Sequence, residues 1–138
     1  MRLNEEMRAV GLKYSPTSLK EFAEKQGIML VILYGSQAEG TADENSDWDI
    51  AVMPKHRTHP DKYNVLYELD KLFEIEIDSC LIDSDSDPLH RWEVFRLGKV
   101  LYEDEPGRFD DEYILSWKIY LDTEKFRRWE RERIEEFK

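Results

Sequence analysis

The stretch "LYGSQAEGTADENSDWDIAV", residues 33–52, decides the fold. Gly35-Ser36 ends one apolar run, and ten residues later Asp47-Trp48-Asp49 opens a second one. Two strands joined by a short helix and a turn fit this order. Residues i and i+2 of a strand face the same way. The carboxylates of Asp47 and Asp49 are therefore predicted to project together, with Trp48 on the opposite face.

Paired carboxylates in this position indicate a metal site. Two of them about 5 Å apart repel by roughly 3 kcal/mol at an effective dielectric constant near 20. A divalent cation relieves that repulsion, and Mg²⁺ prefers one or two carboxylates with water and phosphate oxygens. A third carboxylate is expected from the alternating stretch "EIEIDSCLI", residues 74–82. Asp78 is preferred over Glu76 because it lies deeper in the expected strand.

The Gly-Ser step supplies a place for phosphate. Free backbone N–H groups at the start of a helix, together with the Ser36 hydroxyl, can hold phosphate oxygens. Gly35 leaves room for close approach to the backbone. The chain has no Gly-Lys-Ser/Thr after this glycine, so the loop is not of the Walker type.

The remaining pattern predicts a single mixed α/β domain, residues 1–138, with a small mixed β-sheet flanked by helices and a long C-terminal helix. Ser18 and Glu21 have capping-box spacing in the first helix. Expected strands are 28–35, 47–54, 74–82 and 100–103; expected helices are 15–27, 36–40, 59–73, 87–98 and 109–138.

Charge and composition restrict the partners and the compartment. The 138 residues include 20 basic and 31 acidic ones, a net charge of −11, which disfavours nucleic acid and favours a basic protein as partner. The single cysteine, Cys80, allows no internal disulfide. The first residues lack the apolar core of a signal peptide, and no apolar run reaches the roughly 18 residues of a membrane helix. A cytoplasmic protein is expected.

Three further motifs are assigned no function. "DSDSDP", residues 83–88, begins like a calcium loop but has Pro88 where glycine is needed and Val94 where the last glutamate is needed. His56 and His59 lack further zinc ligands nearby in the sequence. Cys80 is expected to pack within the sheet.

The run Gly35-Ser36, ten residues, Asp47-Trp48-Asp49 resembles the signature of the DNA polymerase beta-like nucleotidyltransferase superfamily. Leu33-Tyr34, Ala38, Gly40, Ser46 and "IDSCLID" make the chain look like the MNT-type minimal nucleotidyltransferases. The resemblance covers about residues 15–103. It implies the polymerase beta-like nucleotidyltransferase fold and Mg²⁺-dependent transfer of AMP from ATP. It also implies that Asp47, Asp49 and Asp78 bind metal, that Asp78 helps to deprotonate the acceptor, and that Gly35 and Ser36 contact the triphosphate.

The same resemblance implies a partner. Minimal members are often encoded beside a HEPN-domain protein, commonly an RNase toxin. They act as the antitoxin by placing AMP on a tyrosine of that toxin. The small size agrees, because few residues remain to bind a separate acceptor. A non-catalytic module that caps its partner, and an enzyme for a small hydroxyl compound such as an aminoglycoside, remain alternatives. The C-terminal helix either covers its own domain or docks a partner through its apolar residues Trp117, Leu121, Phe126, Trp129, Ile134 and Phe137.

Overall fold

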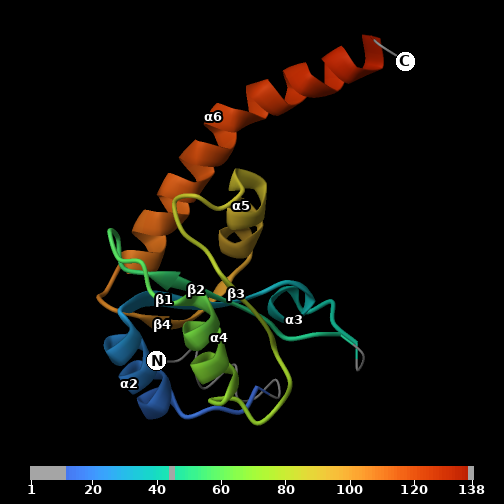
Figure 1. Ribbon diagram of the computed structural model, residues 1–138. Coiled ribbons are helices and arrows are strands. Elements are labelled where there is room, and N and C mark those ends of the chain that lie inside the picture. The colour runs from blue at the N-terminus through green and yellow to red at the C-terminus, as the bar shows by residue number, and fades with distance from the viewer. Residues whose placement is uncertain (1–11, 44–45, 137–138) are drawn as a thin grey trace.

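The computed structural model describes residues 12–43 and 46–136. A four-stranded sheet lies between two groups of helices (Figure 1). The elements are, in chain order, α2 (Pro16–Gln26), β1 (Ile28–Tyr34), α3 (Ser36–Glu39), β2 (Asp49–Pro54), α4 (Lys62–Asp70), β3 (Asp78–Leu81), α5 (Pro88–Arg96), β4 (Lys99–Glu103) and α6 (Arg108–Glu136).

The sheet is mixed, as predicted. Its strand order is β3-β2-β1-β4. β1 runs antiparallel to both β2 and β4, whereas β2 and β3 are parallel. The crossover from β2 to the parallel strand β3 passes through α4, which is the usual solution for a parallel pair.

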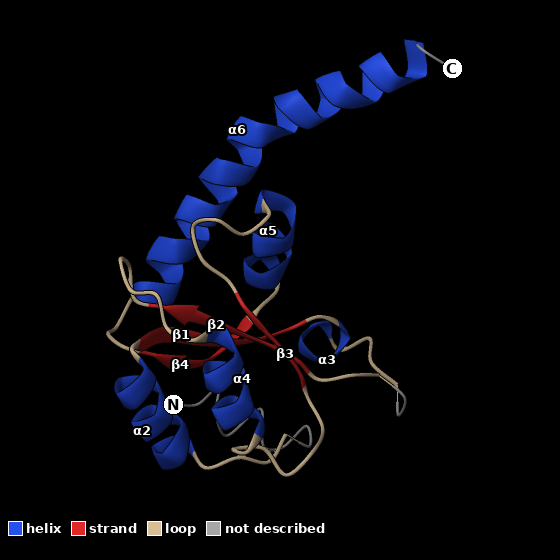
Figure 2. Cartoon of the chain, in the orientation of Figure 1, coloured by secondary structure: helices blue, strands red, loops and turns tan. Residues whose placement is uncertain are grey.

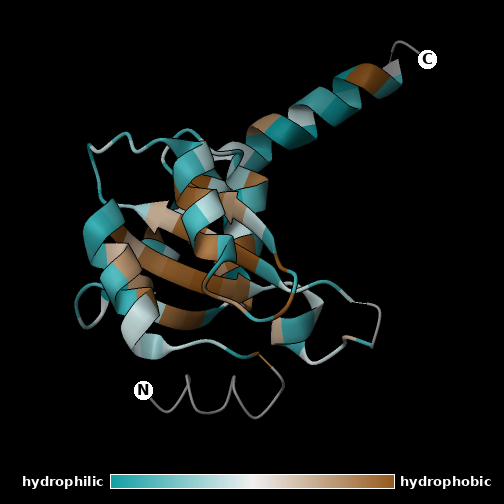
Figure 3. Cartoon of the chain, turned by 60° about the horizontal axis from the view of Figure 1, so that its bottom comes forward, coloured by the Kyte–Doolittle hydropathy of each residue, from teal (hydrophilic) through white to brown (hydrophobic). Residues whose placement is uncertain are grey.

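Helices cover both faces of the sheet. α2 and α4 pack on one face, and α5 and the first part of α6 pack on the other (Figures 1 and 2). β1 is buried between these layers over all but its last residue. This explains why residues 28–34 are continuously apolar instead of alternating. In Figure 3 the strands are mostly hydrophobic, whereas much of the helical surface is hydrophilic.

Alternation along β2 decides which face carries the predicted carboxylate. Ile50 and Val52 belong to the core under α2 and α4, and Trp48 packs against the same core. Ala51 and Met53 belong to the core under α5 and α6. By the two-residue period of a strand, Asp49 lies on the α5 and α6 face.

The first helix begins three residues earlier than the predicted capping box. Ser15, not Ser18, is the N-cap, and its hydroxyl accepts a hydrogen bond from the Ser18 N–H at 3.2 Å. Pro16 follows at the first helical position, where its fixed φ fits and no N–H is needed. The Ser18–Glu21 capping box was therefore wrong.

The strand β3 and the helix α4 are shorter than predicted. The segment 74–82 pairs as a strand only over Asp78–Leu81, because its sole neighbour β2 begins at Asp49. Upstream, the chain turns to the N-terminal segment instead: Tyr14 and Phe73 form an isolated bridge. The helix expected over 59–73 spans only Lys62–Asp70.

The long C-terminal helix is confirmed as α6. Its first half packs on α5 and its second half extends away from the domain (Figure 2). Within the described ranges, no helix has both the length and the apolar composition that a bilayer span requires.

Candidate active site

Gly35 brings the end of β1 against a carboxylate. Its φ is 76° and its ψ is −159°, a conformation that L side chains rarely adopt. A Cβ on this residue would lie 2.4 Å from Oδ2 of Asp49. Only glycine therefore allows this turn and the Asp49 carboxylate to approach each other so closely.

The short helix α3 follows directly. The N–H groups of Ala38 and Glu39 donate to the Gly35 carbonyl, each at 3.1 Å. These bonds leave the preceding N–H groups of Ser36 and Gln37 at the open end of the turn. The Gln37 side chain donates to the carbonyl of Ser46 at 3.2 Å, which ties α3 to the segment that leads into Asp47.

Asp49 and Asp78 are direct neighbours in the sheet. They are Cα partners at the first position of the parallel β2–β3 pair. The Asp78 N–H donates to the carbonyl of Trp48 at 2.8 Å and fixes this register. Because both strands follow the same alternation, the two carboxylates lie on the same face of the sheet.

The negative charges of Asp47, Asp49 and Asp78 repel one another when no cation is bound. Burial raises the pKa of Asp49, and the negative charges of Asp78 and Asp47 raise it further. Both neighbours therefore act on Asp49. Carboxylate oxygens of this kind are the donors that Mg²⁺ prefers, so the residues present fit a magnesium site.

The three predicted carboxylates are not equally placed. Asp47 precedes β2 and lies in a loop, so the predicted strand alternation does not position it. Glu76 lies outside β3. Across residues 12–43 and 46–136, no three His, Cys, Asp or Glu side chains form a group ready to hold a metal ion. The structure thus pairs Asp49 with Asp78 and leaves Asp47 at the edge.

A polar cluster beside the carboxylates was not predicted. The Tyr34 hydroxyl lies 3.4 Å from Sγ of Cys80, which in turn lies 3.7 Å from Nε2 of His90. Burial raises the pKa of the Tyr34 hydroxyl and that of the Cys80 thiol. The only sequence signal for this cluster was position: Tyr34 precedes Gly35, and Cys80 shares a face with Asp78. His90 gave no signal, because α5 brings it there through tertiary packing.

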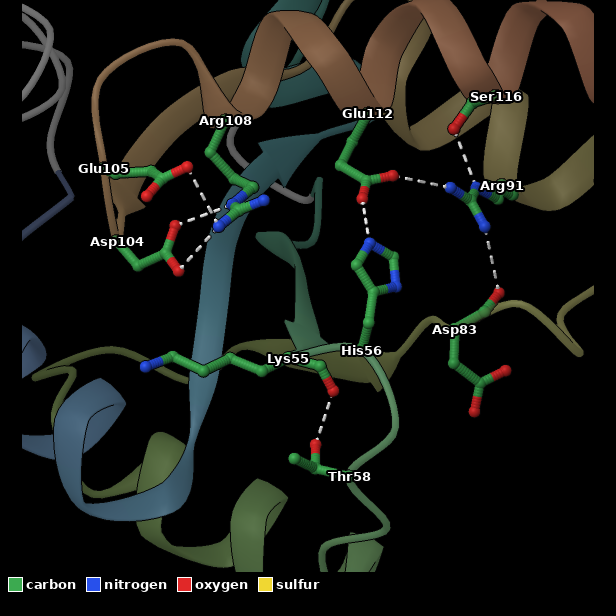
Figure 4. Close-up of polar contacts among 10 residues, drawn as sticks. All are labelled: Lys55, His56, Thr58, Asp83, Arg91, Asp104, Glu105, Arg108, Glu112 and Ser116. Carbon is green, nitrogen blue, oxygen red and sulfur yellow. Dashed lines mark hydrogen bonds and ion pairs between the residues drawn. The ribbon is translucent and has the colours of Figure 1, made fainter.

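A second network lies at the opposite end of β2 (Figure 4). The buried Glu112 accepts a bond from Arg91 at 3.0 Å and contacts Nε2 of His56 at 2.5 Å, and Arg91 also donates to Ser116 at 2.7 Å. His56 thus ties the segment after β2 to α6 through this carboxylate. In the calcium-like segment, the Asp83 carboxylate accepts the Asp85 N–H at 2.8 Å and stabilises a turn.

Comparison with known proteins gives a family match. Residues 17–106 match the family described as polymerase beta, nucleotidyltransferase. The chain is also 29% identical over 133 residues to the protein adenylyltransferase MntA of Aphanizomenon flos-aquae (strain 2012/KM1/D3), over 86% of this chain and 83% of that protein.

Solved structures share the fold. A toxin-antitoxin complex with AMP-PNP contains a chain with a TM-score of 0.66 and 18% identity, over 87% of this chain and 98% of that one. A complex of the tri-AMPylated Shewanella oneidensis HEPN toxin with its MNT antitoxin contains a chain with a TM-score of 0.63 and 15% identity, over 86% and 94%. At such identities the likeness concerns the fold.

Proposed function

The chain belongs to the polymerase beta nucleotidyltransferase family, and from this premise we propose that it transfers AMP from ATP to a tyrosine hydroxyl of a partner protein. The partner is a HEPN-type RNase toxin, and the chain is its cytoplasmic antitoxin. The resemblance to a protein adenylyltransferase over most of both chains supports this assignment.

One observation carries the proposal. Asp49 and Asp78 lie side by side on the neighbouring strands β2 and β3, and the Gly35 turn comes directly against Asp49. A site of this kind brings a triphosphate, held at the Gly35-Ser36 turn, against a pair of carboxylates. Neither the carboxylate repulsion nor the requirement for glycine at position 35 benefits folding alone.

The family resemblance implies the residue roles, and the positions of Asp49 and Asp78 support them. Asp49 and Asp78, with Asp47, are the ligands for Mg²⁺, which when bound stabilises negative charge on the phosphates. The Ser36 hydroxyl and the N–H groups of the α3 turn hold the triphosphate. Asp78 lies at the sheet edge and accepts the proton of the acceptor hydroxyl. The tyrosine oxygen then bonds to the α-phosphorus of ATP, and pyrophosphate leaves.

The proposed function also divides the chain into a catalytic core and a helical tail. About residues 15–103 form the catalytic core, and the helical tail begins near 109. A second candidate, a module that neutralises its partner by binding alone, is favoured by the exposed second half of α6.

The test incubates the chain with α-labelled ATP, magnesium and the protein encoded by the adjacent gene. Label is expected on a tyrosine of that protein and is expected to disappear with the Asp47→Asn/Asp49→Asn variant. If this variant still neutralises the partner at full strength, the binding module is correct. Label on an aminoglycoside instead of the protein would indicate a small-molecule enzyme.

A further inference from the structure

The second half of α6, residues 121–136, is here called the distal arm. Among the described residues, no hydrogen bond, ion pair or ring contact joins its side chains to another element. Upstream, Trp92 of α5 packs against the rings of Tyr113 and Tyr120, with centroids 5.2 and 5.9 Å apart. Beyond Tyr120 the polar side-chain contacts of the described residues stay within the helix: Arg127 donates to the hydroxyl of Thr123 and to the Tyr120 carbonyl. Figures 1 and 2 show the distal arm extending away from the sheet.

The distal arm nevertheless carries large apolar side chains. Phe126 is 58% exposed and Trp129 is 51% exposed. They lie at i and i+3 on one side of the helix, with ring centroids 5.9 Å apart. The Arg133 guanidinium lies over the Trp129 ring at 5.1 Å. Exposed aromatics grouped with arginine are the composition of protein interfaces.

The middle of the distal arm is basic, although acidic residues at both of its ends give residues 121–136 a net charge of −1. Residues 125–133, "KFRRWERER", contain five basic and two acidic residues, a local net charge of +3 in a chain of net charge −11. A partner that covers Phe126 and Trp129 therefore meets this basic segment. Long-range complementarity favours an acidic surface on that partner. The basic partner expected from total charge does not fit this part of the molecule.

The distal arm also lies on the appropriate side of the sheet. It continues from the half of α6 that packs on the face covered by α5 (Figure 1). Asp49 and Asp78 project from this same face, because Ala51 and Ile82 on the same alternation belong to the core beneath α5 and α6. A protein bound to the distal arm is thus held on the side of the sheet from which the Asp49 and Asp78 carboxylates project.

We propose that the distal arm is the docking site for the acceptor protein, through an acidic surface with an apolar groove that takes Phe126 and Trp129. This inference rests on the proposed function, which makes the bound protein the acceptor of AMP. RNA is disfavoured as the occupant because Glu130 and Glu132 interrupt the basic residues that would follow a phosphate backbone.

The first test measures binding to the protein encoded by the adjacent gene, by calorimetry without ATP. Phe126→Ala/Trp129→Ala is expected to weaken binding at least tenfold, whereas Tyr63→Ala is expected to change it less than twofold. Tyr63 is a matched control because its ring is 84% exposed on α4, on the opposite face of the sheet. Circular dichroism checks that α6 remains helical.

A charge-reversal pair tests the acidic partner surface. Arg128→Glu/Arg131→Glu is expected to weaken binding at least tenfold at low salt and less at high salt. The control Lys20→Glu reverses an exposed charge on α2 and is expected to leave binding unchanged.

Transfer kinetics separate docking from catalysis. The Phe126→Ala/Trp129→Ala variant is expected to raise KM for the acceptor at least tenfold, with KM for ATP unchanged. Unchanged binding and KM would overturn the docking site while AMP transfer stands. Arm-dependent binding without any AMP transfer would support docking and remove the proposed function.

Three other outcomes also overturn the proposal. The first is no binding by the wild-type chain. The second is a dimer of the isolated chain, seen by sedimentation, that is lost when Phe126 and Trp129 are replaced, which would make a second copy the occupant. The third is displacement of the acceptor by a single-stranded RNA oligonucleotide that binds the distal arm.

Discussion

At the scale of single residues, Gly35 links backbone geometry to the carboxylate site. Replacement by alanine introduces a Cβ 2.4 Å from Asp49 Oδ2 at a φ of 76°. Either the turn or the carboxylate must move, and a shift of about 1 Å near the reacting groups can cost about 100-fold in rate. Gly35→Ala is therefore expected to lower AMP transfer about 100-fold or more, measured with labelled ATP.

Gly40 provides the control for this variant. Its φ is 77°, but an added Cβ meets nothing within 4 Å. Gly40→Ala thus introduces left-handed strain of about 1 kcal/mol without the clash, whereas Gly35, with a ψ of −159°, lies in a region that almost only glycine adopts. Equal activities in the two variants would show that the contact with Asp49 is irrelevant to the site.

Asp49 gives a prediction about pH. Its pKa is higher in the folded chain because of burial and then the charges of Asp78 and Asp47. The folded chain therefore holds this proton more tightly than the unfolded chain, so ionisation of Asp49 lowers stability. This loss is complete above the folded-state pKa and disappears as the pH falls below the ordinary value of about 3.9.

In EDTA, Asp49→Asn is therefore expected to unfold at higher urea concentration than wild type at pH 7, with the difference shrinking toward about pH 4. Because Asp49 is a proposed metal ligand, the same variant is expected to reduce AMP transfer by roughly 1,000-fold. Glu93→Gln, an exposed acid on α5, serves as control. A less stable Asp49→Asn at pH 7 would contradict the electrostatic account.

Local pattern predicted part of this site and could not predict the rest. Gly35, Ser36 and Asp49 lie within a short stretch, where strand ends and spacing are legible from sequence. Asp78 required the assumption that residues 74–82 pair beside β2, and the pairing exists over four residues. His90 reaches Cys80 only because α5 folds back over the sheet, and no local periodicity encodes that.

At the scale of elements, the register of β3 decides between two acids. Asp78 is paired with Asp49, whereas Glu76 is exposed and lies before the strand begins. Asp78→Asn is expected to lower AMP transfer by roughly 1,000-fold, since it removes the residue that we propose as both a metal ligand and the base. Glu76→Gln is expected to retain activity within about twofold. The reverse result would assign the third carboxylate to Glu76 and require a different register.

The packing of α5 against α6 includes a buried ion pair between Arg91 and Glu112. Arg91 and Glu112 are each 3% exposed, and burial lowers the pKa of Arg91 while the Glu112 charge opposes that change. Glu112→Ala leaves the guanidinium unpaired and is expected to destabilise the fold by about 3 kcal/mol. Glu24→Ala removes an exposed partner of Lys20 at 4.0 Å and is expected to cost less than about 0.5 kcal/mol. Urea unfolding compares them, and equal losses would contradict the role of burial.

Element boundaries show what sequence periodicity omits. Apolar alternation extended the predicted strand back to Glu74, but a strand ends where its neighbour ends, and β2 begins at Asp49. Similarly, α6 was predicted as a single helix from its composition, yet the change from packed to unpacked halves depends on where α5 stops. The local sequence pattern predicts neither which strand will pair with a given strand nor how far a neighbouring helix will extend.

At the scale of the whole molecule, the fold consists of a packed domain and the distal arm that the domain does not support. A chain ending at Thr123 keeps Tyr113, Ser116 and Tyr120 in place against α5. Because the described residues among those removed form hydrogen bonds, ion pairs and ring contacts only within α6, the free energy of unfolding is expected to change by less than about 1 kcal/mol. Urea titration followed by circular dichroism measures it.

A chain ending at Leu115 is the matched comparison, because it also removes Ser116 and Tyr120 and exposes Trp92. We expect it to lose about 2–4 kcal/mol from lost aromatic burial and an unsatisfied Arg91. Equal stability losses in the two truncations would mean that the distal arm folds back onto its own domain in solution. The expected contrast instead leaves a stable domain without its arm, in which any weakening of partner binding must come from the missing contact surface and not from loss of the fold.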